Sequence, residues 1–164
     1  MANIADLFTH NRWANLALLD ACSTLTDAQL DAVVPGTYGS TRATLLHLAG
    51  AERRYVQGLR DEARSPIPDL EAFPGFDALR ASLEETGSDL ESLAATLEGT
   101  DSLRRTFADA DWVIEHRVVL VQAINHATEH RAHIMTTLTS AGVAPIDLDG
   151  WAWGEATGAA HKSS

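Results

Sequence analysis

Several features are missing from this sequence, and each absence removes a class of protein. Cys22 is the single cysteine among 164 residues, which excludes an intramolecular disulfide and an all-thiolate zinc site. No apolar run approaches the roughly 20 residues that cross a bilayer. The N-terminus also lacks the basic stretch followed by an apolar one that marks a signal peptide. We therefore expect a cytoplasmic protein in which Cys22 is a small buried hydrophobic residue.

Basic residues are scarce as well. The sequence contains 12 lysines and arginines against 23 acidic residues, for a formal net charge of -11. A nucleic-acid-binding surface and a surface that docks on anionic lipid both need positive charge, so we expect neither partner. Glycine-rich phosphate loops, the Gly-x-Ser-x-Gly elbow and the His-Glu-x-x-His zinc motif are also absent. These absences leave the chain without a common signature of catalysis.

Helical periodicity dominates what is present. Apolar residues recur at spacings of three and four in four long stretches, which are 4–22, 42–60, 76–97 and 116–141. Four long amphipathic helices without a clear sheet predict an all-α, up-down four-helix bundle. Residues 103–116 have the pattern of a short hairpin before the last long helix. We expect the bundle to span residues 1–145, and residues 146–164 to form a tail that packs on the bundle or on a partner subunit.

Three histidines lie close together in the fourth predicted helix. Residues four apart share one face of a helix, so His126 and His130 lie one turn apart beside an apolar stripe. His133 shares that side but lies roughly 10 Å further along the helix axis than His126, at about 1.5 Å per residue. We favour His126 and His130 as a ligand pair, with His130 and His133 as the alternative. Glu129 points about 100° away from His130 and is interpreted as an exposed residue.

A third ligand has to come from another helix. His47 lies at the edge of the apolar stripe of the second long helix, where a lone histidine is usually a core residue. Three neutral imidazoles bind Zn²⁺, Ni²⁺, Fe²⁺ or Cu²⁺ and leave a coordination position open for water or substrate. Two other side chains, Asn11 and Asn15, lie within the apolar stripe of the first helix. They either form hydrogen bonds inside the bundle or line a polar pocket.

Three segments together resemble the DinB-like superfamily. The run Asn125-His126-Ala127-Thr128-Glu129-His130-Arg131 is similar to the family's Asn-His-x-x-x-His-Arg segment. The runs Leu46-His47-Leu48-Ala49-Gly50-Ala51-Glu52 and Arg12-Trp13-Ala14-Asn15 resemble two further family segments. The resemblance covers nearly the whole chain. It implies a four-helix bundle, often dimeric, with one divalent metal held by His47, His126 and His130. The family often has a polar run after the His-Arg pair, and Ala132-His133 departs from it, which leaves open whether His133 joins the rim of the site.

The resemblance leaves more than one function open, because a fold does not fix a reaction. Relatives in the superfamily include transferases that use a low-molecular-weight thiol, so one hypothesis is a metal-dependent hydrolase or thiol (S-) transferase acting on a small molecule. Zinc or nickel is the expected metal, ahead of iron or copper. An alternative is a non-catalytic, stress-related metal-binding module that forms a homodimer. A third interpretation treats the histidines as polar core residues. We expect a homodimer in the first two cases.

Overall fold

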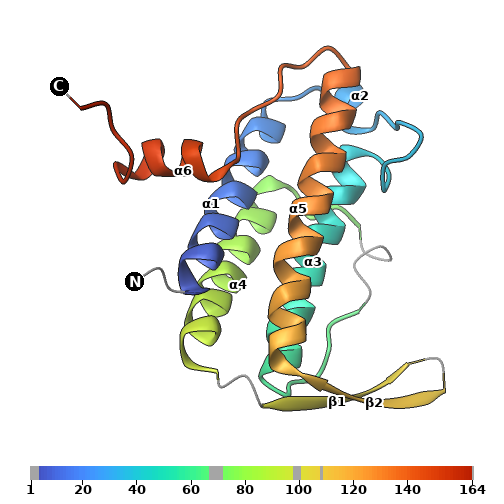
Figure 1. Ribbon diagram of the computed structural model, residues 1–164. Helices are drawn as coiled ribbons and strands as arrows, with labels where there is room; N and C mark the ends of the chain where they lie inside the picture. The colour runs from blue at the N-terminus through green and yellow to red at the C-terminus, as the bar shows by residue number, and fades with distance from the viewer. Residues whose placement is uncertain (1–3, 67–71, 98–100, 108, 164) are drawn as a thin grey trace.

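The long helices pack side by side as a bundle (Figure 1). The computed structural model describes residues 4–66, 72–97, 101–107 and 109–163. The long helices are α1 (Ile4–Ser23), α3 (Thr41–Leu59), α4 (Phe76–Thr96) and α5 (His116–Ser140). Two short helices, α2 (Asp27–Leu30) and α6 (Gly150–Thr157), lie outside this set. The predicted four-helix bundle is therefore confirmed. None of the helices in the described part of the chain is long and apolar enough to cross a bilayer.

The long helices follow one another around the bundle in the order α1, α4, α3, α5. Hydrogen bonds between α3 and α4 join residues in the same order along both helices. Glu52 is bonded to Thr86, and Arg60, just after α3, is bonded to Asp89. These two helices are therefore parallel, and the directions of the four helices are up, down, down, up (Figure 1). This order differs from the alternating up-down arrangement that the sequence predicted, because the chain between α3 and α4 joins opposite ends of the bundle. The connection from residue 60 to 75 has to return along the bundle. At up to roughly 3.3 Å per residue it is long enough to pass a helix of this size.

The interior contains two apolar clusters with a polar layer between them. One cluster lies toward the α2 end and the other toward the hairpin end, and each takes residues from all four long helices. Cys22 belongs to the first cluster, where burial raises the pKa of its thiol to about 12. The thiol therefore stays uncharged at neutral pH, and Cys22 packs as an apolar residue, as predicted. Between the clusters lie the buried polar residues Asn11, Asn15, Glu52, Thr86 and Arg131, and buried His130 lies next to Arg131 in the chain. This layer sits at the level of the histidines on α5.

The hairpin and the tail complete the chain. Strands β1 (Ser102–Phe107) and β2 (Ala110–Glu115) pair antiparallel, which confirms the predicted hairpin, and β2 leads directly into α5. Helix α6 was not expected from the sequence. Asp149 begins it by accepting hydrogen bonds from the backbone N–H groups of Trp151 and Ala152. The tail meets α1 at His10, whose Nε2 atom lies 2.9 Å from the carbonyl oxygen of Leu148.

Candidate metal centre

Three histidine side chains from two helices converge on one point. His47 projects from α3, and His126 and His130 project from α5. Nε2 of His126 lies 3.0 Å from Nε2 of His47 and 3.1 Å from Nε2 of His130. One ligand nitrogen from each ring lies within 4.8 Å of the other two. The structure thus brings together the three residues that the sequence singled out.

These separations suit a shared cation. Imidazole nitrogens bind zinc at about 2.0–2.1 Å, so two of them on one ion lie about 3.0–3.4 Å apart, depending on the coordination angle. The two Nε2 separations from His126 fall in this range. His130 is buried, whereas His47 and His126 are half-buried. Three nitrogen donors at a partly open position could hold one divalent metal and leave room for another ligand.

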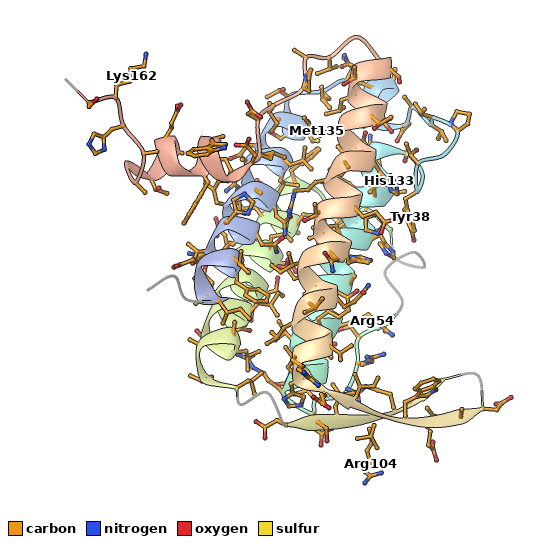
Figure 2. All side chains as sticks on the ribbon, viewed as in Figure 1. Tyr38, Arg54, Arg104, His133, Met135 and Lys162 are labelled. Atoms are coloured by element: carbon orange, nitrogen blue, oxygen red, sulfur yellow. The ribbon has the colours of Figure 1, made fainter. Side chains whose placement is uncertain are left out.

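A loop residue supports the first histidine. The hydroxyl of Tyr38 lies 2.7 Å from Nδ1 of His47, and the two rings lie 4.2 Å apart between centroids. If Nδ1 donates its proton to this hydroxyl, the lone pair of the His47 ring remains on Nε2, where the other two histidines are. Metal-binding histidines almost always have such a partner on the second nitrogen. Tyr38, which is labelled in Figure 2, comes from the loop between α2 and α3, and its ring also lies 4.8 Å from the ring of His130 between centroids.

Burial keeps the side chain of His126 neutral. The pKa of His126 is lowered to about 4, first by burial and then by the neighbouring His130 and His47. A neutral ring has a lone pair to offer, while a protonated ring does not. His126 is therefore in the form that binds a metal at neutral pH.

His133 lies beside the three histidines without joining their point of convergence. Its ring centroid is 5.6 Å from that of His130, and the two rings are close to perpendicular. The group of nitrogen atoms within 4.8 Å of one another contains His126 and His130 but not His133. Of the two pairs considered from the sequence, the first is the one that meets His47. His133 is left at the edge of the group.

Behind the histidines, the polar layer ties all four long helices together. Nη1 of Arg131 donates to the side-chain oxygens of Asn11 and Asn15, at 2.7 Å each. The amide nitrogens of Asn11 and Asn15 donate in turn to Glu52, at 3.3 and 2.9 Å. Thr86 donates to the other oxygen of Glu52 at 2.6 Å. Because Arg131 follows His130 in the chain, this network fixes α5 at the level of the histidines.

The network changes the interpretation of the two asparagines. Asn11 and Asn15 are 1% and 2% exposed, so neither can contact a substrate. The hypothesis that they form hydrogen bonds inside the bundle is confirmed. The sequence analysis did not find Glu52 or Arg131 as buried residues. Glu52 follows Leu48 by four residues and Arg131 follows Ala127 by four, so helical spacing already placed each of them on a buried face.

Comparisons with known proteins agree with this architecture. The model of the DinB family matches residues 1–160. Among solved structures, the crystal structure of a DinB-like protein from Bacillus cereus is similar, with a TM-score of 0.66. The match covers 88% of this chain and 94% of that chain at 15% sequence identity, so the likeness is one of fold alone. No curated protein matches the chain.

Proposed function

Because this chain belongs to the DinB family, we propose that it binds a single divalent metal ion through His47, His126 and His130. The convergence of their Nε2 atoms is the observation that supports the proposal. Zinc or nickel is the metal we expect, and three imidazoles would also accept iron or copper. Tyr38 would hold the ring of His47 in place, and the buried network at Arg131 would hold α5.

We propose further that the protein is a metal-dependent hydrolase or thiol (S-) transferase that acts on a small molecule. A divalent metal with an open position polarises a carbonyl group or activates water or a thiol near neutral pH. The residues of the chain would supply the setting for that chemistry. His126 stays unprotonated at neutral pH, and the half-buried position of His47 and His126 leaves one side of the group accessible.

We also propose that two copies of the chain associate. Large apolar side chains on neighbouring faces of α1 and α5 are exposed, with Ile4 at 49%, Leu7 at 55% and Val121 at 58%. They surround a shallow depression of about 130 Å³ that has Phe8 and Leu120 among its walls. Covering this surface with the same surface of a second copy would remove the apolar residues from water.

Elemental analysis of protein purified without a polyhistidine tag tests the metal site. We expect about one equivalent of a first-row divalent metal per chain, and loss of that metal in His47→Ala. Calorimetry with a panel of low-molecular-weight thiols then tests the transferase. Binding to metal-loaded protein and not to chelator-treated protein would support it.

Other results would contradict these proposals. Protein reconstituted with zinc and with nickel that still retains no metal after desalting would refute the metal site. Equal thiol binding with and without the metal would refute a metal-dependent transferase. Full metal content without turnover of any thiol or hydrolysable substrate would favour the non-catalytic module instead.

A further inference from the structure

A cavity lies between α3, α5 and the hairpin. Its volume is about 170 Å³. Apolar side chains form much of its wall, and these are Leu103, Ile114, Val118 and Val119. Pockets for drug-sized ligands usually measure roughly 300–1,000 Å³. This cavity therefore suits a small molecule, or one end of a larger one, with a short apolar portion.

Three arginines meet at the same cavity. Arg54 and Arg64 line it directly. Arg105 reaches it across Gly58, because a Cβ atom at Gly58 would lie 3.4 Å from Nη2 of Arg105 and 3.9 Å from Nη2 of Arg64. Nη1 of Arg54 also donates to the carbonyl oxygen of Ser65. Two arginines on one small cavity, with a third just behind Gly58, are unexpected in a chain of net charge -11. A local concentration of positive charge of this kind attracts an anion.

The surroundings of these arginines favour a negative ligand. Nε and Nη2 of Arg105 are buried and have no hydrogen-bond partner among the described residues. Burial, together with the charges of Arg105 and Arg54, lowers the pKa of Arg64. Leaving a buried donor unsatisfied costs about 1–3 kcal/mol, and more for a charged group. A carboxylate in the cavity would offset the repulsion among these positive charges, and it could accept two parallel hydrogen bonds from a guanidinium that faces it.

The cavity is adjacent to the three histidines. Tyr55 lines the cavity, and its ring meets the ring of His126 edge-on with centroids 5.7 Å apart. Gln122, one helical turn before His126, also lines the cavity and donates to the hydroxyl of Tyr55 at 3.5 Å. In Figure 2 the labelled Arg54 lies between Tyr38 and the hairpin. A ligand anchored here would extend toward His126 past Tyr55 and Gln122.

We propose that this cavity binds the carboxylate end of a small organic acid through Arg54, Arg64 and Arg105, with the short apolar portion of the ligand against the aliphatic wall. The acid is thereby the substrate class of the adjacent histidine site. That last assignment rests on the proposed function, whereas binding of the acid itself does not. A carboxylate fits better than phosphate because the cavity offers an apolar wall next to the charge.

Calorimetry with hexanoate as the probe and hexanamide as its neutral counterpart tests the proposal. We expect hexanoate to bind and hexanamide to bind at least tenfold more weakly. Arg105→Gln and Arg64→Gln should each weaken hexanoate binding at least tenfold. Arg104→Gln is the matched control, because neighbouring residues of a strand point to opposite faces and Arg104 is exposed. Equal affinity for acid and amide, or equal loss in all three variants, would overturn the proposal, as would inorganic phosphate binding as tightly as hexanoate.

A second pair of variants separates binding from folding. Val118 is 54% exposed and lines the cavity, so Val118→Glu should fold and place a competing carboxylate there. We expect it to abolish hexanoate binding, while Val113→Glu, at a residue 60% exposed on the hairpin, should not. Unchanged binding in Val118→Glu would overturn the proposal. The same pattern in chelator-treated protein would support the cavity even if elemental analysis had refuted the metal site, so the two proposals can fail separately.

Discussion

The hydroxyl of Tyr38 lies 2.7 Å from Nδ1 of His47, on the side of the ring away from the other two histidines. Removing this contact tests whether it matters for metal binding. We expect Tyr38→Phe to weaken metal affinity roughly tenfold or more, because losing the partner of a ligand histidine typically costs 10–100-fold. Competition with a chromogenic chelator measures the change. Tyr55→Phe is the control, since Tyr55 meets His126 through its ring and not through its hydroxyl. Equal affinities in Tyr38→Phe and the unmodified protein would exclude the supporting role.

The second prediction separates His133 from the proposed ligands. His126→Ala and His130→Ala should each abolish stoichiometric metal, because their nitrogens lie 3.1 Å apart at the point of convergence. His133→Ala should keep most of the metal, since His133 lies outside that group. Elemental analysis of the three variants side by side gives the answer. A loss in His133→Ala equal to that in His126→Ala would move the site one turn along α5.

The helices that carry the three histidines, α3 and α5, show how far sequence reasoning reaches. The spacing of His126 and His130 puts both rings on one face of a helix wherever that helix packs, so a local pattern was enough to find them. Tyr38 could not be found in this way. It belongs to a loop, and the path that brings its hydroxyl to His47 depends on how α2 and α3 pack. Helical periodicity carries no information about such a path.

The parallel direction of α3 and α4 and the burial of Glu52 and Arg131 could not be predicted from the sequence, for different physical reasons. A connection from residue 60 to 75 is long enough either to turn or to return along the bundle, so the parallel arrangement of α3 and α4 was not determined by length. Glu52 and Arg131 occupy faces that apolar spacing already marked as inner. Charged residues are almost never fully buried without partners, so the sequence favours a solvated position until the partners are known. The amides of Asn11 and Asn15 are those partners.

A third prediction concerns the pH dependence of stability. Burial raises the pKa of Glu52 to about 7, from 4.5 for the ordinary side chain. The folded state therefore binds this proton more tightly than the unfolded state. Its contribution is fully present below about pH 4.5 and is lost as the pH rises to about 7. At about 1.4 kcal/mol per pH unit, the free energy of unfolding should be about 2 kcal/mol larger at pH 5.5 than at pH 7.5 from this group alone.

Urea unfolding at the two pH values, in the presence of a chelator, measures this contribution. Glu52→Gln cannot titrate and should lose this part of the pH dependence. Glu129→Gln, at an exposed position on α5, should keep it. Equal pH dependence in Glu52→Gln and the unmodified protein would show that Glu52 is already ionised at pH 5.5.

A fourth prediction tests the proposed association of two copies. Val121→Glu places a charge in the middle of the apolar surface formed with Ile4 and Leu7. We expect this variant to be a monomer at concentrations where the unmodified protein is a dimer, because burying an unpaired charge in an interface is unfavourable. Light scattering after size-exclusion chromatography gives the mass. Val33→Glu, at a residue 67% exposed in the loop before α3, should remain dimeric. A dimer that survives Val121→Glu would place the contact on another surface.

The fifth prediction is one in which helix propensity and packing give opposite answers. Gly87 lies inside α4, where alanine would be favoured by about 1 kcal/mol on propensity alone. A Cβ atom at Gly87, however, would lie 2.6 Å from Cγ and 2.9 Å from Cβ of Arg12, and the guanidinium of Arg12 is paired with Glu91. The Cβ atom of Arg12 is fixed to the backbone of α1, so moving it requires the two helices to separate. Overpacking of this kind costs about 1–3 kcal/mol.

We therefore expect Gly87→Ala to lower the free energy of unfolding by about 1 kcal/mol, because a typical overpacking penalty of about 2 kcal/mol exceeds the gain of about 1 kcal/mol in propensity. Chemical denaturation monitored by circular dichroism measures the change. Ser88→Ala, at the next and exposed position of the same helix, should leave stability unchanged or raise it by a few tenths of a kcal/mol. If Gly87→Ala is instead as stable as Ser88→Ala, then α1 and α4 approach each other less closely at this point than the contact with Arg12 implies, and glycine is not required there.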